Sequence, residues 1–446
     1  MRNLTEGSPL RLILSFSLPL LLGNFLQQLY NVTDAVLVGR ALGAQALAGV
    51  GAASSVMLLV IGFCTGATAG FAVPVARFFG AGDEGKMRER IFQGALLSLA
   101  LAALLTALTT VFCSDILRLL QTPAAVFPEA YAYLFLIFLG IPFTVLYNFL
   151  AGILRAVGDS RTPLFMLLAS TLLNVVLDLL LILVIPLGVT GAALATVLAQ
   201  AVSAGLCLLV IGKRFRALIP GREDRRLNGA GVGELLGMGL PMGFQYSITA
   251  IGSMLMQAAN NALGGVYVVA FTMGMRVKQL VLAPFDALAT GLSNFCSQNR
   301  GARRADRISL GVRRCFAVGL GYAAGMGLLL IFAGGALSQM FLDASETGAI
   351  AASAQYLRTI GCFLWCVWIL ILCRMTVQGL GFGGRSVLSG VMEMLARGAM
   401  SLLVIPVYGF SAVCFTDPVS WAAGSLLIGP ICWWCLRQVK KSCRPD

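Results

Sequence analysis

The sequence predicts an all-α membrane protein: twelve transmembrane helices in two pseudo-symmetric six-helix bundles around a central cleft. Three observations support this fold class: an apolar composition, twelve apolar runs of membrane-spanning length, and a repeat that relates the two halves. Of the 446 residues, 58% are hydrophobic and only 11% are charged. Soluble domains carry about 25% charged residues, so lipid must be the main solvent of this chain.

Apolar runs define the expected spans, because a helix needs about 20 such residues to cross the hydrocarbon core of a bilayer. They lie near residues 12–38, 46–76, 92–113, 129–153, 163–186, 189–212, 234–260, 265–298, 313–334, 353–380, 387–410 and 417–436. Only helices and closed barrels satisfy their backbone groups in lipid, and the alternating ten-residue segments of a barrel are absent.

The two halves are related by a nearly constant shift along the sequence. Gly70 falls on Gly291 with a shift of 221, and Pro19 falls on Pro241 with a shift of 222. Because each half has six helices, both halves enter the membrane from the same side and the repeat is parallel. We expect an N-terminal six-helix lobe at 1–212, a polar cytoplasmic linker at 213–233 and a C-terminal six-helix lobe at 234–446.

The basic residues between the spans set the expected orientation. Most of the 32 Lys and Arg fall in loops on one side, and only Arg40, Arg118 and Arg358 fall in loops on the other. Because basic residues collect in cytoplasmic loops, we expect both termini in the cytoplasm and the chain in the cell inner membrane. The net charge of +13 thus reflects topology rather than binding of nucleic acid.

Several function classes are disfavoured by what the sequence lacks. The 12 Cys are scattered and there is no His, so zinc and iron–sulfur sites are not expected. There is no GxxxxGK[ST] phosphate loop and no nucleophile elbow. We therefore expect neither an enzyme nor an ATP-driven pump, and no cofactor. Transport would draw on an ion gradient or be passive.

The first span carries a polar stripe. Gln27, Tyr30, Asn31 and Asp34 recur at i, i+3, i+4 and i+7, so they share one face of an apolar helix. Pro19, early in the span, is expected to kink that helix. An ionisable group within a membrane is costly and is a functional candidate by default. The alternative is a seam of helix–helix hydrogen bonds.

A second group of polar residues lies in the fifth and sixth spans. Asn174 and Asp178 are four residues apart and share a face, and Thr196 lies early in the next span. A carboxylate, an amide oxygen and a hydroxyl suit a proton or a small hard cation such as Na⁺. Two buried carboxylates repel each other, and a bound proton or Na⁺ relieves that repulsion. A purely structural polar cluster is the alternative.

The spans of the second half hold ionisable residues whose roles the sequence leaves open: Arg276, Lys278, Asp286, Arg374, Glu393 and Arg397. Glu393 and Arg397 are four residues apart in the order that favours a helical ion pair, and we interpret them as structural. Asp286 is a candidate partner for Lys278 or Arg276.

Several motifs follow one another in a specific order: Pro19 with the polar stripe, GAQALAGVG at 43–51, LRAVGDSRTP at 154–163, Asn174 with Asp178, and GVTGAALAT at 188–196. With Pro241 and Gln245 in the second half, this order resembles the multidrug and toxic compound extrusion (MATE) family over nearly the whole chain. The resemblance implies alternating access and antiport of H⁺ or Na⁺ against small organic, often cationic, drugs. The expected partners are that substrate and membrane lipid, and the expected state is a monomer.

The resemblance also implies roles for single residues. Members with an ion site in the N-terminal lobe have an Asp on helix 1, an Asn and an Asp on helix 5 and a Thr on helix 6, which correspond to Asp34, Asn174, Asp178 and Thr196. Positions that line the same lobe for substrate correspond to Gln27, Tyr30, Asn31, Tyr133 and Asn148.

Another branch of the family uses carboxylates on helices 7 and 10. Here helix 7 has no carboxylate except Glu234 at its start, and the charged residue inside helix 10 is Arg374. This difference favours the N-terminal site, as in the DNA-damage-inducible branch.

Three alternatives remain open at this point. A major facilitator would have twelve spans, but the GxxxDRxGRR order between helices 2 and 3 is missing. A flippase for a lipid-linked saccharide, from the same superfamily, would favour a strongly basic cavity that holds pyrophosphate. A membrane scaffold would have little use for carboxylates within its spans.

Overall fold

The computed structural model describes residues 3–340 and 345–443, and these residues form helices and no strand. This confirms the predicted all-α fold class. Arg2 and Arg444, two of the basic residues expected on the cytoplasmic side, lie outside the described residues.

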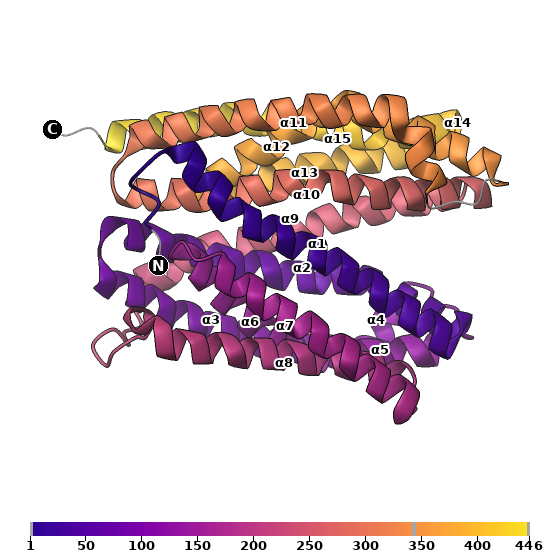
Figure 1. The fold of residues 1–446 in the computed structure, drawn as a ribbon, viewed down its shortest axis with the longest axis horizontal. Coiled ribbons are helices and arrows are strands. Elements are labelled where there is room, and N and C mark those ends of the chain that lie inside the picture. Colours follow the sequence, from indigo (N-terminus) through magenta and orange to yellow (C-terminus); the bar gives the residue numbers. More distant parts are fainter. Residues whose placement is uncertain (1–2, 341–344, 444–446) are drawn as a thin grey trace. The chain divides into compact units, whose positions relative to one another are not determined.

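The helices of the first half follow the expected spans (Figure 1): α1 (Pro9–Leu42), α2 (Ala44–Ala81), α3 (Glu84–Val111), α4 (Cys113–Leu119), α5 (Phe127–Leu139), α6 (Ile141–Ala156), α7 (Arg161–Asp178), the π-helical η1 (Leu179–Val184) and α8 (Val189–Arg214). The second half contains η2 (Arg216–Leu218), α9 (Gly229–Asn261), α10 (Gly265–Gly301), α11 (Ala305–Gln339), α12 (Thr347–Gly379), α13 (Gly383–Ala399), the π-helical η3 (Met400–Val404), α14 (Ile405–Tyr408) and α15 (Phe410–Ser442).

Within the described residues, ten continuous helical segments are long and apolar enough to cross a membrane. The expected fourth span is the bent pair α5–α6, with an angle of 48° between its two parts. The bend lies at Gly140, just before Pro142, which cannot donate a backbone hydrogen bond. Helix α9 has 33 residues and completes the predicted twelve, but it is more polar than these ten segments.

The chain divides into two compact units. Unit 1 comprises Leu18–Ser247 with the first three residues, and unit 2 comprises Leu4–Ser17 with Ile248–Asp446. The lobe boundaries expected at 212 and 234 were placed by counting six helices in each half. The compact units instead divide within α1, after Ser17, and within α9, after Ser247. The linker and the first part of α9 pack within unit 1, whereas the first part of α1 packs within unit 2. Each of these two helices is therefore shared between the units.

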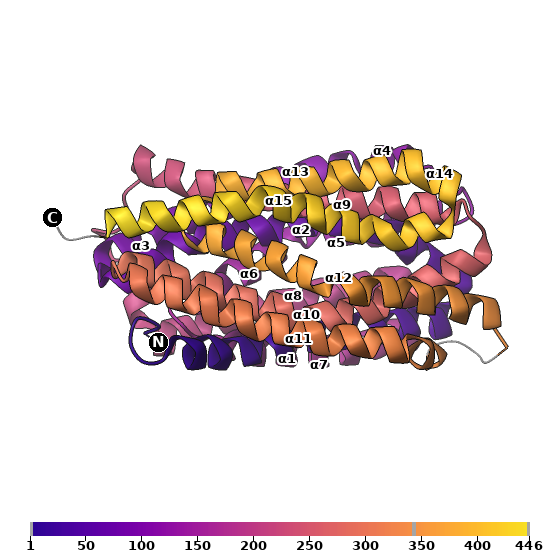
Figure 2. The same cartoon turned by 90° about the horizontal axis from the view of Figure 1, so that it is seen from above.

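Within unit 1, α2 packs against α3, α5 and α6, and α7 packs against α8 (Figure 1). Within unit 2, α12 packs against α10, α11 and α15, and α13 packs against α15 (Figure 2). The linker is held against α3, because Arg88 Nε donates to Asp224 Oδ2 over 2.7 Å and Gln93 Nε2 donates to the Arg226 carbonyl over 2.9 Å.

Close packing of glycines explains why α9 begins within unit 1. A Cβ on Gly70 of α2 would lie 2.6 Å from the Gly239 Cα of α9, and a Cβ on Gly66 would lie 2.5 Å from the Met242 carbonyl oxygen. Two helices approach this closely only where no side chain separates their backbones. Gly70, which the repeat relates to Gly291, thus forms a contact between α2 and α9 in unit 1.

The backbone confirms the predicted repeat. Gly188 precedes α8 with φ 63° and ψ −141°, and Gly409 precedes α15 with φ 60° and ψ −141°. Their sequence numbers differ by 221, the shift found between Gly70 and Gly291. Residues with side chains rarely adopt this conformation, so both turns depend on glycine. The π-helical segments η1 and η3 also begin 221 residues apart.

Candidate functional site

The polar residues predicted in the first half meet inside unit 1. Tyr30 of α1 and Thr196 of α8 share a hydrogen bond of 3.0 Å between their hydroxyl oxygens. Asp34 lies one helical turn beyond Tyr30 on α1. The hydrogen bond therefore joins α1 and α8, two of the helices that were predicted to form one ion site.

Helix α7 supplies the other predicted ligands at its last turn. Asn174 and Asp178 are each 1% exposed, and Asp178 immediately precedes the π-helical turn η1. The carboxyl groups of Asp178 and Asp34 are close enough for their charges to interact. Tyr133 of α5 is buried and lies within electrostatic range of both carboxyls. Tyr30, Asp34 and Thr196 are half-buried. The residues of α1, α5, α7 and α8 therefore gather in one region that is mostly shielded from solvent.

The oxygen atoms of this region are suitable ligands for a cation. It offers two carboxyl groups, the amide of Asn174 and the hydroxyls of Tyr30 and Thr196. Asp34 Oδ1 is buried and has no hydrogen-bond partner among the described residues. A carboxylate buried in this way needs a proton or a cation, because an uncompensated charge in low dielectric is costly.

Other predicted residues lie less centrally. Asn31 is exposed, so the polar stripe of α1 is only partly covered by protein. Gln27 is half-buried. Asn148 is also half-buried, and its Nδ2 donates to the Thr144 carbonyl of its own helix over 3.0 Å. Pro19 lies inside α1, two residues after the point where this helix passes from unit 2 to unit 1. The binding roles of these residues remain predictions.

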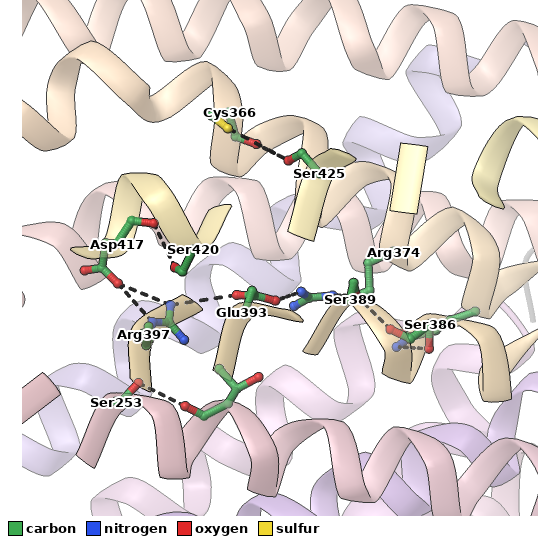
Figure 3. Close-up of polar contacts among 12 residues, drawn as sticks. Ser253, Cys366, Arg374, Ser386, Ser389, Glu393, Arg397, Asp417, Ser420 and Ser425 are labelled. Atoms are coloured by element: carbon green, nitrogen blue, oxygen red, sulfur yellow. Dashed lines mark hydrogen bonds and ion pairs between the residues drawn. The ribbon is translucent and has the colours of Figure 1, made fainter. Parts of the chain in front are cut away.

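Unit 2 contains a second buried polar group that the sequence revealed only in part (Figure 3). Its centre is Asp417 of α15, which is 2% exposed. Asp417 Oδ2 accepts from Lys278 Nζ over 2.5 Å and from the Tyr356 hydroxyl over 2.9 Å. Asp417 Oδ1 accepts from Arg397 Nη2 over 3.2 Å and from Arg397 Nε over 3.3 Å.

Glu393 extends this group along α13. It forms an ion pair with Arg374 of α12, whose Nε also donates to Ser389 Oγ over 3.1 Å. The predicted pair between Glu393 and Arg397 is present, with 3.7 Å between Oε2 and Nη2. Both residues nevertheless have shorter contacts with other helices. We call Lys278, Arg374, Glu393, Arg397 and Asp417 the unit 2 charge cluster.

The suggested pairing of Asp286 with Lys278 or Arg276 is wrong. Lys278 is bound to Asp417, while Asp286 and Arg276 are exposed and form no ion pair within the described residues. Asp417 was missed because the expected span began at this residue. Helix α15 begins at Phe410, so Asp417 lies two turns inside the helix. Gly409, which repeats Gly188, was the signal that could have placed this helix start earlier.

A family model described as MatE matches residues 19–180 and 241–397, one match in each half of the repeat. Together the matches cover well over half of the chain. This chain belongs to the MatE family. That membership makes it a multi-pass membrane protein of a multidrug efflux transporter family rather than an enzyme. It also favours multidrug efflux over the alternative function, a flippase for a lipid-linked saccharide.

Individual MatE proteins resemble this chain over most of its length. It is 30% identical over 361 residues to a "Probable multidrug resistance protein YpnP" of Bacillus subtilis, covering 81% of this chain and 80% of the relative. It is 27% identical over 301 residues to the "FAD transporter" of Shewanella oneidensis, covering 67% of this chain and 66% of the relative. A crystal structure of MATE in the bent conformation matches with a TM-score of 0.90 at 22% identity, over 99% of this chain and 98% of the other. That likeness confirms the twelve-helix fold.

Proposed function

We propose that this MatE protein is an antiporter that exchanges H⁺ or Na⁺ for small organic, often cationic, compounds by alternating access. The ion binds at Asp34, Asn174, Asp178 and Thr196 in unit 1. The observation that carries the proposal is that the buried carboxyl group of Asp178 on α7 lies within electrostatic range of Asp34 on α1, whose Oδ1 is buried and has no hydrogen-bond partner among the described residues. Their repulsion in a low dielectric favours uptake of a proton or a small cation.

The ion and the substrate compete through these carboxyls. In the outward-facing state, H⁺ or Na⁺ neutralises Asp34 and Asp178, which weakens their attraction for a cationic substrate or reshapes α1 at Pro19. The substrate leaves to the outside and the ion-loaded protein returns to the inward-facing state. An ion drives this cycle only if it binds the two states with different affinity. Gln27, Tyr30, Asn31, Tyr133 and Asn148 contact the substrate in the same lobe.

The proposal places the protein in the cell inner membrane as a monomer, with both termini in the cytoplasm. The excess of Lys and Arg in the loops on one side supports this orientation. Reporter tags fused to each terminus test it, since a tag on the cytoplasmic side is protected from protease added to intact spheroplasts.

The decisive experiment is efflux of a fluorescent organic cation from proteoliposomes that contain the purified protein. Efflux is measured with a pH gradient in the absence of Na⁺, and then with a Na⁺ gradient at equal pH. We expect one gradient to drive efflux by the wild type and neither to drive it by Asp34→Asn. FAD is tested as an additional compound, because one relative is named as an FAD transporter.

Asp306→Asn is the matched control, because Asp306 is an exposed acid in the first turn of α11, away from the predicted site residues. It should transport like the wild type. Gradient-driven efflux by Asp34→Asn at the wild-type rate would refute the ion-site assignment. If no gradient drives any of the compounds while the protein is folded, the antiport proposal itself fails.

A further inference from the structure

Three membrane-spanning segments of unit 2 carry an arginine at one of their ends. Arg300 lies in the last turn of α10, Arg385 in the first turn of α13 and Arg437 near the end of α15. The Arg300 Cζ lies 5.0 Å from the centre of the Phe382 ring, just before α13 begins. Arg300 and Arg385 both act electrostatically on the thiol of Cys435 in α15. The three guanidinium groups therefore gather around the last two turns of α15.

Two of these arginines stack on neighbouring tryptophans of α15. The Arg437 Cζ lies 3.5 Å from the centre of the Trp433 ring, and the Arg385 Cζ lies 3.7 Å from the centre of the Trp434 ring. Both arginines are exposed, and neither forms an ion pair in the part of the chain that the structure describes. Stacking on a ring fixes the plane of a guanidinium group but does not cancel its charge. Each arginine is thus a positioned cation whose N–H edge can bind an anion.

The outward faces of α13 and α15 change from apolar to basic toward this end. On α15, Leu426 is 78% exposed and Trp433 is 56% exposed, and Arg437 follows at i+11 on the same face. On α13, Arg385 is followed at i+3 by the exposed Leu388. These two helices pack against each other (Figure 2). A face that passes from leucine to tryptophan and then to arginine matches the passage from acyl chains to headgroups at a bilayer surface.

From this geometry we propose that the end of α15 binds anionic phospholipid, such as phosphatidylglycerol, through Arg385 and Arg437. A guanidinium group donates parallel N–H bonds to the oxygens of a phosphodiester, and the exposed leucines contact the acyl chains. A zwitterionic headgroup would bring its own ammonium group to these cations, so the site selects lipids by net charge. The proposal concerns residues of unit 2 only and does not depend on the antiport proposed for unit 1.

The test is native mass spectrometry of the purified full-length protein in a neutral detergent. The protein is titrated with dioleoyl phosphatidylglycerol or with dioleoyl phosphatidylcholine, which have the same acyl chains and differ in headgroup charge. We expect phosphatidylglycerol to bind more tightly, by on the order of tenfold, because each base near the surface strengthens binding of an anionic lipid. Inorganic phosphate, added at the same concentration, should not displace the lipid because it has no acyl chains.

Substitutions locate the binding site. Arg385→Gln and Arg437→Gln should each weaken the binding of phosphatidylglycerol about fivefold and leave that of phosphatidylcholine unchanged. Arg437→Lys keeps the charge but loses the planar fork, so its loss should be smaller than that of Arg437→Gln. Arg314→Gln is the matched control, because Arg314 is an exposed base of α11 that stacks on no aromatic ring in the described residues. It should bind both lipids like the wild type.

Three outcomes would overturn the site. In the first, the wild type binds the two lipids equally or binds neither. In the second, Arg314→Gln loses as much affinity for phosphatidylglycerol as Arg385→Gln and Arg437→Gln, which would indicate attraction by net charge alone. In the third, inorganic phosphate displaces the lipid, which would assign the arginines to a soluble phosphate instead. Because all four substitutions lie on the surface, loss of folding does not obscure the comparison.

Discussion

In unit 1 the buried polar residues near the end of α7 are Asn174 and Asp178, whereas in unit 2 the repeat-related helix α13 carries Glu393 and Arg397 near its end. Both helices run into a π-helical turn, and both are followed by a glycine with almost the same backbone angles. The backbone of the repeat is therefore preserved while its charges differ. The ion-site residues of unit 1 include two acids and no base, but the two acids of the unit 2 charge cluster are bound by three bases.

This difference separates two uses of a buried carboxylate. In unit 2 the chain neutralises Asp417 and Glu393 itself, so these acids hold helices together. In the antiport that we propose, a proton or a cation from outside the chain neutralises Asp34 in unit 1, so that the site can be emptied and filled. Substitutions in unit 2 should therefore cost stability, and those in unit 1 should cost ion coupling.

The largest effect is expected from Asp417→Asn. This change leaves Lys278 and Arg397 without their shared carboxylate, and loss of one partner from a buried ion pair costs about 3–5 kcal/mol. The equivalent change in unit 1, Asp178→Asn, removes a charge that Asp34 repels and should leave stability unchanged or higher. Unfolding in detergent, followed by circular dichroism, measures both. Equal losses in the two variants would mean that both clusters are structural.

A smaller difference is expected where α2 and α10 meet the shared helices. Gly70 and Gly291 are equivalent in the repeat, and both are buried. A methyl group on Gly70 would strike the backbone of α9 at Gly239, which cannot move aside, while one on Gly291 would meet the Ser17 hydroxyl, which can rotate. We expect Gly70→Ala to cost about 1–3 kcal/mol, as overpacking typically does, and Gly291→Ala to cost less.

Gly237→Ala is the control for the intrinsic effect of replacing a helical glycine by alanine. Gly237 lies on α9, is exposed, and has no atom within 4 Å of the position of an added Cβ. Alanine at an exposed helix position is favoured over glycine by about 0.5–1 kcal/mol, so this variant should be slightly more stable than the wild type. Thermal unfolding of the three variants side by side measures the order. A loss in Gly291→Ala as large as that in Gly70→Ala would contradict the proposed difference.

The fold could be predicted from the sequence because its main determinant is local. A run of about 20 apolar residues is visible without knowledge of any partner, and the shift between the halves is visible in Gly70 and Pro19. Features that depend on backbone geometry within a run were not predicted. The bend at Gly140 and the π-helical turns have no clear hydropathy signal, since the flanking residues are apolar throughout.

The candidate sites were predictable only to the extent that their residues share a helix. The faces of α1 and α7 follow from helical spacing, so Tyr30 and Asp34, and likewise Asn174 and Asp178, could be grouped. Which helices meet cannot be derived from spacing, and this is why Asp286, and not Asp417, was suggested as a partner for Lys278 or Arg276. Contacts between α10 and α15 span 139 residues of sequence and depend on tertiary packing.

The smallest effect is expected at the start of α3, where the repeat again differs between the units. Asp83 caps this helix, because its Oδ1 accepts from the Lys86 backbone N–H over 3.0 Å. Arg304, which is 221 residues further on, occupies the same position before α11 and makes no side-chain cap. Asp83→Ala should cost about 1 kcal/mol, and Arg304→Asp should add a comparable amount by providing the missing cap.

The pH dependence of this cap follows from its titration. The hydrogen bond from the Lys86 backbone, helped by the Lys86 charge, lowers the pKa of Asp83 in the folded protein. The stabilisation is therefore complete above the unfolded-state pKa of about 3.9 and is lost as the pH falls through the lower folded-state pKa. Thermal unfolding of the wild type and Asp83→Ala should differ at pH 7 and at pH 5, and the difference should shrink below about pH 4. A constant difference down to pH 3 would show that Asp83 stabilises α3 through contacts other than its ionised carboxylate.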